Sequence, residues 1–452
     1  MNSSSDATFS PTDAGIAYPS SGRANFALAV LLLAYIFSFI DRQVLSLLVE
    51  PMKQDLNIGD FEVSLLQGMA FAVFYTFMGI PIAKLADTRN RKTIITIGIA
   101  VWSLMTFFCG LAKSFTGLFL ARIGVGVGEA ALSPAAYSML ADYFPPRKLP
   151  RAMAIFTMGI SIGGGLAYVI GGAVLDTIAG SWLAELPVLK TMRPWQLTFV
   201  VVGLPGLLIA LLMIAVREPL RQGSNGANAV SHSDNSFRKT LEFVGENRRS
   251  YLALFLGISL LSVFGYGLMA WYPSLFIRTY GLSASEVGLK FGVIYLVFGS
   301  LGALGGAWFA QRLARRGHVD ANLRWPVYAS VLMMLPGIFV PLLGSAELMF
   351  WACMPLIFIQ NSYFGVSLAA LQLVTPNHMR AQVGALLLFL TNLIGMTFGP
   401  SVVAALTDFV FHDPMMLRYS LSIVAAIFCP LAAMVFASGL RHYRGMTESS
   451  AR

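Results

Sequence analysis

The sequence is poor in charged residues, in cysteine and in histidine. Asp, Glu, Lys and Arg make up 12% of its 452 residues, whereas soluble domains hold about 25%. The three cysteines lie in apolar segments and lack the spacing of a metal site. The five histidines all fall in polar segments. We therefore expect no metal, no cofactor and no enzyme active site built on histidine or cysteine.

Long apolar runs fill most of the chain. Hydrophobic residues make up 56% of it, and the mean hydropathy is +0.70. A helix needs about 20 apolar residues to cross a bilayer. The sequence predicts an all-α membrane protein with twelve transmembrane helices, near residues 26–48, 61–82, 93–112, 115–140, 152–175, 195–216, 250–275, 286–310, 325–344, 347–373, 381–406 and 418–440.

Polar segments divide these helices into two groups of six. Residues 1–24 are rich in Ser and Pro and lack the features of a cleaved signal, so we expect a disordered N-terminal tail. The longest connection, 218–249, is rich in Gly, Asn and Ser and reads as a linker. The predicted units are six-helix bundles at 25–217 and 250–441, followed by a tail at 442–452.

The distribution of Lys and Arg predicts the orientation in the membrane. With both termini on one side, 22 of these residues fall in the loops and tails of that side and seven on the other. Cytoplasmic loops carry the excess of positive charge. We therefore expect cytoplasmic termini in a multi-pass protein of the inner (plasma) membrane. The net charge of +9 then requires no nucleic-acid partner.

The two halves resemble each other at matching places. LADTRNRK at 85–92 and FAQRLARR at 309–316 both follow the second helix of their half, and IGGGLAYVIGGAVLD at 162–176 matches IGMTFGPSVVAALTD at 394–408 in the fifth. Duplicated bundles indicate pseudo-symmetry and alternating access, in which one bundle rocks against the other around a central site.

Four charged residues lie deep inside predicted spans, where charge is costly and marks functional paths. They are Asp41 and Arg42 in the first span, and Arg122 and Glu129, two turns apart on one face of the fourth. Buried carboxylates beside arginines suit proton coupling. We expect Asp41 to carry the proton, Arg42 and Arg122 to be its charge partners, and Glu129 to be a second titratable site. A static ion pair between the two helices is the alternative.

The C-terminal half offers neutral polar and aromatic side chains instead. Such a wall opposite a charged one would suit an amphiphilic substrate with a polar head and an apolar tail. Hydrogen bonding between helices is the alternative role for the Asn and Gln residues. The candidates for the substrate cavity are Tyr168, Tyr266, Trp271, Gln360, Asn361, Tyr363 and Asn392.

The segment GIPIAKLADTRNRK at 79–92 resembles the signature loop of the major facilitator superfamily. Asp87, Arg91 and Lys92 match that signature, whereas Ala83, Thr88 and Asn90 depart from it. The resemblance implies a latch, with Asp142, that holds the inner ends of the second and eleventh helices together while the transporter faces outward. A solvated loop is the alternative.

Three further segments resemble the Spinster branch of that superfamily: IDRQVLSLLVEPMKQDLNIGD at 40–60, ARIGVGVGEAALSPAAYSMLADYF at 121–144 and GGGLAYVIGG at 163–172. The resemblance implies proton-coupled transport of a lysophospholipid or sphingoid lipid, with Asp41, Arg42, Arg122 and Glu129 in the coupling network. It also implies a monomer whose partners are protons, membrane lipids and its substrate.

Efflux antiport or symport of drugs or organic-anion metabolites is the alternative within transport. Tyr168 stands where antiporter-type members of the superfamily have Pro, which counts against the usual antiporter. A receptor would need a larger soluble domain than the linker offers. A channel is disfavoured by the latch signature and the duplicated halves.

Overall fold

The computed structural model describes residues 18–179, 191–221, 233–376 and 379–450. The described part has helices joined by loops and no strands, and twelve of its helices are long and apolar enough to span a membrane, which confirms the predicted fold class. The spans are Ser21–Leu47, Asp60–Thr88, Arg91–Leu111, Phe115–Tyr143, Leu149–Leu175, Pro194–Ala215, Arg248–Tyr280, Ala284–Arg315, Ala321–Leu342, Ala346–Val374, Gln382–Phe411 and Pro414–Glu448.

The first six spans form one bundle, the N-bundle. Each pairs an apolar segment with polar residues at its ends; Asn90 and Ser114, for example, cap the helices that follow them with their side chains. Its elements are α1 (Ser21–Gln43), η2 (Val44–Leu47), α2 (Val49–Leu56), α3 (Asp60–Ser64), η3 (Leu65–Met69), α4 (Ala70–Thr88), α5 (Arg91–Leu111), α6 (Phe115–Glu129), α7 (Leu132–Tyr143), α8 (Leu149–Ala179) and α9 (Pro194–Ala215).

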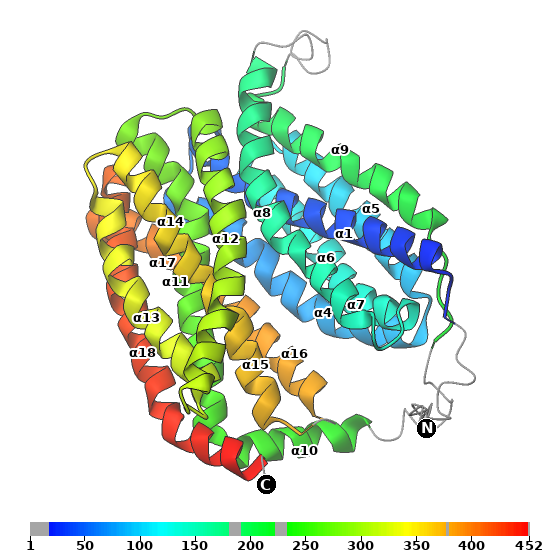
Figure 1. Cartoon of the computed structure of the whole chain (residues 1–452). Helices are drawn as coiled ribbons and strands as arrows, with labels where there is room; N and C mark the ends of the chain where they lie inside the picture. The colour runs from blue at the N-terminus through cyan, green and yellow to red at the C-terminus, as the bar shows by residue number, and fades with distance from the viewer. Residues whose placement is uncertain (1–17, 180–190, 222–232, 377–378, 451–452) are drawn as a thin grey trace, which may run out of the picture.

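The last six spans form the C-bundle, which lies beside the N-bundle (Figure 1). Its elements are α11 (Arg248–Tyr280), α12 (Ala284–Arg315), α13 (Ala321–Phe339), η5 (Val340–Leu342), α14 (Ala346–Ser362), α15 (Phe364–Val374), α16 (Arg380–Thr391), η6 (Asn392–Met396), α17 (Thr397–Ala405), η7 (Leu406–Phe411), η8 (Pro414–Met416) and α18 (Leu417–Ser450).

The chain departs from the predicted polar segments in three places. Helix α1 begins inside the predicted tail, at Ser21. The predicted linker contains a helix, α10 (Ser233–Glu246), which packs against α11 and α16. Helix α18 runs through the predicted C-terminal tail to Ser450. In α10, the buried Thr240 and the half-buried Phe243 and Val244 lie on one face, so amphipathic periodicity rather than overall hydropathy marks this helix.

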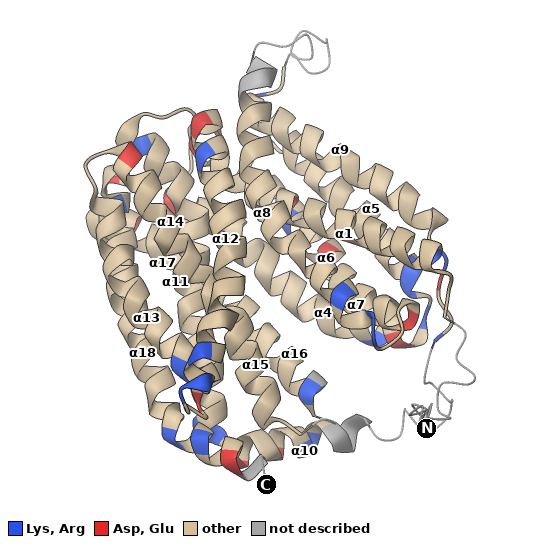
Figure 2. Ribbon diagram, in the orientation of Figure 1, with Lys and Arg blue, Asp and Glu red and all other residues tan. Residues whose placement is uncertain are grey.

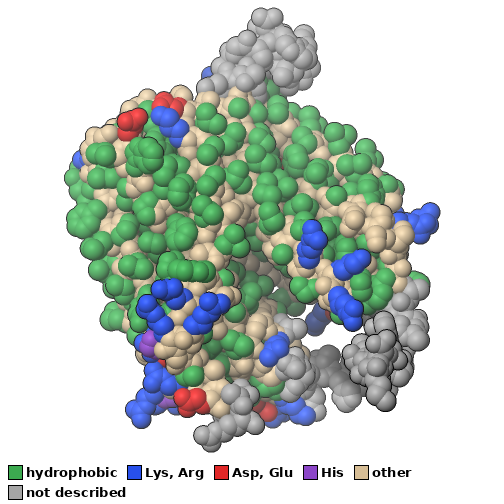
Figure 3. Space-filling model, in the orientation of Figure 1, with side chains coloured by type: hydrophobic (Ala, Val, Ile, Leu, Met, Phe, Trp, Pro, Cys, Tyr) green, Lys and Arg blue, Asp and Glu red, His purple; other side chains and the backbone are tan. Residues whose placement is uncertain are grey.

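The two bundles touch at one end of the molecule and separate at the other. We call the end that holds α10 and the C-terminus the inner end, after the orientation predicted from the sequence, and the opposite end the outer end. Lys and Arg gather at the inner end (Figure 2). A hollow opens between the bundles toward that end (Figure 3). With the inner end named in this way, the arrangement is the one called inward-facing.

Candidate functional site

Arg42 and Glu129 form a buried ion pair between α1 and α6. Arg42 Nη2 lies 2.5 Å from Glu129 Oε2, and the Glu129 side chain is fully buried. The hydroxyl of Ser38, one turn before Arg42, donates to the same carboxylate oxygen at 2.6 Å. This corrects the expectation that Arg42 is the partner of Asp41. Neighbouring residues on a helix point in directions about 100° apart, so Asp41 and Arg42 face different helices.

Aromatic rings surround the Arg42 guanidinium. Its central carbon lies 4.4 Å from the ring centre of Phe71, 4.7 Å from that of Phe39 and 5.0 Å from that of Tyr75. The rings favour a cation over their faces and exclude water from it. The sequence analysis assigned the aromatic wall to the C-bundle and missed this group. Two features of the sequence could have indicated it. Phe39 lies close to Asp41 and Arg42 in the chain, and the aromatic residues Phe71 and Tyr75 lie one turn apart on α4.

Asp41 is buried but is not paired with an arginine side chain. It is 1% exposed, and Thr106 of α5 donates to its Oδ2 at 3.2 Å. Arg122 donates instead to backbone oxygens, Nη1 to Asp41 and Nε to Leu66, each at 3.3 Å. Among the described residues, Asp41 Oδ1, Glu129 Oε1 and Arg122 Nη2 have no hydrogen-bond partner. The four predicted residues thus share one buried cluster, with free donor and acceptor capacity.

Two glycines on α6 allow this cluster to form. A Cβ on Gly126 would lie 2.6 Å from the carbonyl oxygen of Phe71, and a Cβ on Gly128 would lie 2.6 Å from the backbone nitrogen of Trp102. Real Cβ atoms do not approach backbone that closely. The glycines therefore let α6 pack directly on α4 and α5 and bring Glu129 to α1.

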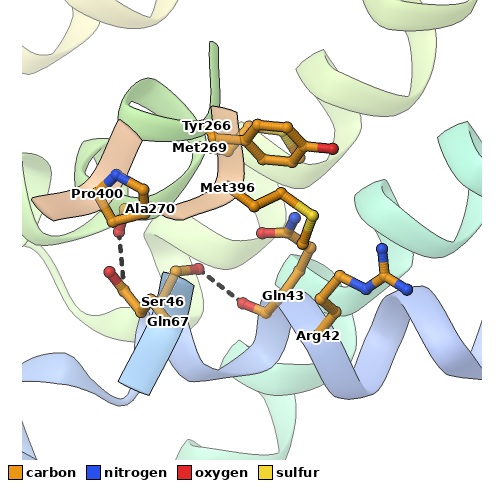
Figure 4. A pocket seen from close by; sticks show the side chains of 9 residues that line it. All are labelled: Arg42, Gln43, Ser46, Gln67, Tyr266, Met269, Ala270, Met396 and Pro400. Atoms are coloured by element: carbon orange, nitrogen blue, oxygen red, sulfur yellow. Dashed lines mark hydrogen bonds between the residues drawn. The ribbon is translucent and has the colours of Figure 1, made fainter. Parts of the chain in front are cut away.

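A pocket lies next to Arg42, between the bundles (Figure 4). The N-bundle contributes polar side chains from α1, η2 and η3, and the C-bundle contributes mostly apolar ones from α11, η6 and α17. Gln67 of η3 crosses between them and donates to the carbonyl oxygen of Ala270 at 3.3 Å. The lining residues are Arg42, Gln43, Ser46, Gln67, Tyr266, Met269, Ala270, Met396 and Pro400.

Of the predicted cavity residues, Tyr266 lines this pocket. Trp271 and Tyr363 are buried in the C-bundle, where Trp271 donates to the Pro400 carbonyl oxygen at 2.9 Å. Tyr168 is buried at the bundle contact and donates to the Met269 carbonyl oxygen, also at 2.9 Å. Bulky rings occupy the contacts between helices rather than the pocket, because these side chains bury the most apolar area.

The neutral polar candidates on the C-bundle do not line this pocket. Asn361 donates within its own helix to Ile357 at 2.9 Å. Gln360 packs against Gly265 of α11, and its Oε1 is buried without a partner among the described residues. Asn392 is half-buried at the start of η6. The alternative role considered for these residues was hydrogen bonding across helices. Among the described residues, Asn361 makes no such bond.

The predicted latch residues meet within the N-bundle. Arg91 pairs with Asp142 at 2.5 Å and with Glu218 at 2.8 Å, and Lys92 donates from its backbone nitrogen to Glu218 at 2.8 Å. In the part of the chain that the structure describes, the exposed Asp87 joins this group through its backbone oxygen, which accepts a bond from Arg221. Among the described residues, Arg91 and Lys92 make no hydrogen bond or ion pair to the C-bundle. The sequence analysis missed Glu218, although it follows the sixth span directly.

The outer end is closed by a second charged cluster that the sequence analysis did not assign. Arg278 of α11 is 5% exposed and contacts Glu50 at 2.7 Å and Asp60 at 2.6 Å. Asp60 also pairs with Lys53, and Asp408 of η7 accepts a bond from the Phe61 backbone nitrogen at 2.7 Å. Arg278 and Asp408 of the C-bundle therefore both bind the N-bundle at the outer end.

The profile of the Major Facilitator Superfamily matches residues 31–400. The chain is 29% identical to the MFS-type efflux pump of Mycolicibacterium smegmatis, with 95% of each chain covered. It is 29% identical to human Protein spinster homolog 1 over 86% of this chain and 74% of that protein.

The structure is also similar to solved transporters. It matches a bacterial homolog of the human lysosomal transporter Spinster, in an inward-facing and unoccupied conformation, with a TM-score of 0.78, 25% identity, and 96% and 98% of the two chains covered. A D-xylose-proton symporter, at 16% identity and a TM-score of 0.68, shares the fold.

The chain belongs to the Major Facilitator Superfamily and is a multi-pass membrane transporter by fold and by relationship. Within that superfamily it is of the Spinster type.

Proposed function

We propose that this protein is a proton-coupled secondary transporter that moves a lysophospholipid- or sphingoid-type amphiphile across the plasma membrane by alternating access. It acts as a monomer, and the proton gradient takes the place of a cofactor. Asp41, Arg42, Arg122 and Glu129 form the coupling network. The observation that supports this proposal is that Arg42 both pairs with Glu129 and lines the pocket between the bundles.

Coupling follows from competition for Arg42. An anionic head group that enters the pocket would contact the Arg42 guanidinium and draw it away from Glu129. A buried carboxylate that loses its cation is favoured in its neutral, protonated form. Proton uptake and substrate binding would then support each other.

Asp41 is the main proton carrier in this proposal. No cationic side chain of the described chain lies within ion-pair distance of its carboxylate, so a proton is the counter-charge available to it. Thr106 fixes one oxygen and leaves the other open.

The pocket also favours an amphiphile. Its N-bundle wall presents Arg42, Gln43 and Gln67, whereas its C-bundle wall presents Met269 and Met396. A polar head and an apolar tail would each find a matching side.

The test is transport in proteoliposomes with an imposed pH gradient. Labelled lysophosphatidylcholine, a sphingoid phosphate and a sugar acid would be followed in the native protein, Asp41→Asn and Glu129→Gln, with the exposed Glu347→Gln as the matched control. Gradient-driven lipid movement that is lost in Asp41→Asn is expected. Full proton-driven activity in that variant would remove Asp41 from the mechanism, and movement of the sugar acid alone would refute the lipid substrate.

Efflux of drugs or organic anions is the second candidate, because similarity to an efflux pump extends over 95% of the chain. Intact vesicles loaded with a fluorescent cationic drug separate the two. Export driven by an inward proton gradient, without lipid movement, would favour the efflux function.

A further inference from the structure

Two groups of cations flank the hollow at the inner end, one on each bundle (Figure 3). All six side chains are exposed. None of them has an acidic partner within ion-pair distance in the described chain. They are Arg312, Arg315 and Arg316 at the end of α12, the α12 cluster, and Arg147, Lys148 and Arg151 at the start of α8, the α8 cluster.

The α12 cluster continues an exposed apolar stripe on the same helix. Leu301, Leu304 and Trp308 are 47%, 72% and 55% exposed. At 3.6 residues per turn, these three residues, Arg312 and Arg315 lie within an arc about 80° wide. The opposite side of the helix faces protein, since Gly306 and Ala310 are buried there. The stripe is therefore a surface that faces the bilayer.

Trp308 and Arg312 form the boundary of this stripe. The Arg312 guanidinium lies over the Trp308 ring, 5.5 Å from its centre. Gly317, with φ of 88°, ends the helix just beyond the arginines. A helix of 32 residues is about 48 Å long, whereas the hydrocarbon core is about 30 Å thick. The arginines therefore extend into the head-group region.

The order of side chains along the stripe matches the order of groups in a phospholipid. Leucines meet acyl chains, tryptophan prefers the interface, and a planar guanidinium matches the phosphate oxygens. Basic clusters beside a transmembrane helix attract anionic lipids. We propose that the α12 cluster and Trp308 bind the phosphate head group of an anionic phospholipid in the inner leaflet, with phosphatidylglycerol as the probe.

The α8 cluster gives this site a consequence for the transport cycle. Helices α8 and α12 pack closely toward the outer end, where a Cβ on Gly172 would lie 2.8 Å from the Ala284 carbonyl oxygen. Their inner ends carry like charges on bundles that must approach when the inner end closes. Like charges repel, so an anionic lipid on the α12 cluster favours the closed inner end.

Binding is tested on the full-length protein by native mass spectrometry after exchange into mixtures of phosphatidylglycerol and phosphatidylcholine. Selective retention of phosphatidylglycerol is expected. Removing one interfacial cation weakens lipid binding roughly fivefold. The triple variant Arg312→Gln/Arg315→Gln/Arg316→Gln should therefore bind phosphatidylglycerol more than about tenfold more weakly than the native protein. The variant with Lys at the same three positions should retain the selectivity for phosphatidylglycerol. This result would show that the loss in the Gln variant is caused by the missing charge and not by misfolding.

The matched control removes three other exposed cations of the inner end, by Arg238→Gln/Lys239→Gln/Arg441→Gln. Equal loss in both triple variants, or equal retention of the two lipids by the native protein, overturns the site. Displacement of the lipid by millimolar inorganic phosphate would identify a soluble-anion site and also overturns it.

The conformational step is measured separately, by spin-label distances between the inner ends of α8 and α12 in nanodiscs. Phosphatidylglycerol should raise the population of short distances in the native protein but not in the triple Gln variant. An unchanged distribution in both would refute the effect on closure. Lipid retention needs no transport, so its failure is distinguishable from failure of the proposed function.

Discussion

At the scale of single residues, the coupling site is defined by pairing rather than by composition. Among the described residues, Glu129 has one cationic partner, Arg42, and one hydroxyl donor, Ser38. The pair is buried, so either charge without its partner would destabilise the folded protein. Loss of one partner should therefore destabilise the protein more than loss of both.

We predict that Arg42→Met lowers the stability of the protein by about 3–5 kcal/mol, because Glu129 is left buried and unpaired. The double variant Arg42→Met/Glu129→Met should recover most of that loss but show no proton-driven transport. Thermal unfolding in detergent and the liposome assay measure the two effects. A single variant as stable as the double one would show that the pair does not hold α1 to α6.

At the scale of elements, two distorted turns meet where the bundles touch. The π-helical turn η3 of the second span packs on η6 of the eleventh, and Gly68 makes the contact possible. A Cβ there would lie 2.4 Å from the Met396 carbonyl oxygen. The helix contact is thus set by backbone approach and not by side-chain chemistry.

Gly68→Ala should separate η3 from η6 and lower stability by about 1–3 kcal/mol. Gly79→Ala in α4 is the matched control, since no atom lies within 4 Å of a Cβ at that position. Thermal unfolding of the two variants is compared. Equal melting temperatures would contradict the contact.

Two ion pairs at the inner end join α18 to α13 through Asp320. Asp320 accepts bonds from Arg324 at 2.9 Å and from Arg444 at 3.0 Å. Burial alone raises the pKa of Asp320, but the bonds from Arg324 and Arg444 outweigh it and hold the pKa below its usual value. The ion pairs thus favour the charged carboxylate in the folded protein.

A lowered pKa in the folded state stabilises the protein above the unfolded pKa of about 3.9, and this stabilisation is lost as pH falls through the folded value. Asp320→Asn should therefore cost roughly 2 kcal/mol at pH 7 and progressively less below pH 4. Melting temperatures measured across that pH range test the prediction, with the exposed Glu448→Gln as control. A difference that is constant with pH would exclude an ionised Asp320.

At the scale of the whole molecule, the outer end is held shut mainly through Arg278. Its partners Glu50 and Asp60 belong to the other bundle, and Asp60 is fully buried. The latch around Arg91 instead lies within one bundle. The distribution of ion pairs between and within bundles therefore matches the inward-facing state.

Arg278→Gln should shift the population toward the outward-facing state by more than about tenfold, because losing one partner of a buried pair costs about 3–5 kcal/mol. Spin-label distances between the outer ends of the bundles measure the shift. Arg193→Gln is the control, since Arg193 is exposed and pairs with Asp55 inside the N-bundle. If both variants remained inward-facing, other contacts would keep the outer end closed.

Three features follow from the sequence alone: the twelve helices, the division into two bundles and the four charged residues of the buried cluster. These features are encoded locally: about twenty apolar residues require a spanning helix, and a charge inside such a span stands out wherever it lies.

The packing of the helices against one another determines which charges meet. That Arg42 pairs with Glu129 and not with Asp41, and that Arg278 closes the outer end, depends on the rotation and depth of each helix relative to its neighbours. It also decided that Trp271 and Tyr363 fill the C-bundle, leaving Tyr266 at the pocket. Rotation and depth are set by packing across helices far apart in sequence, and no local pattern contains them.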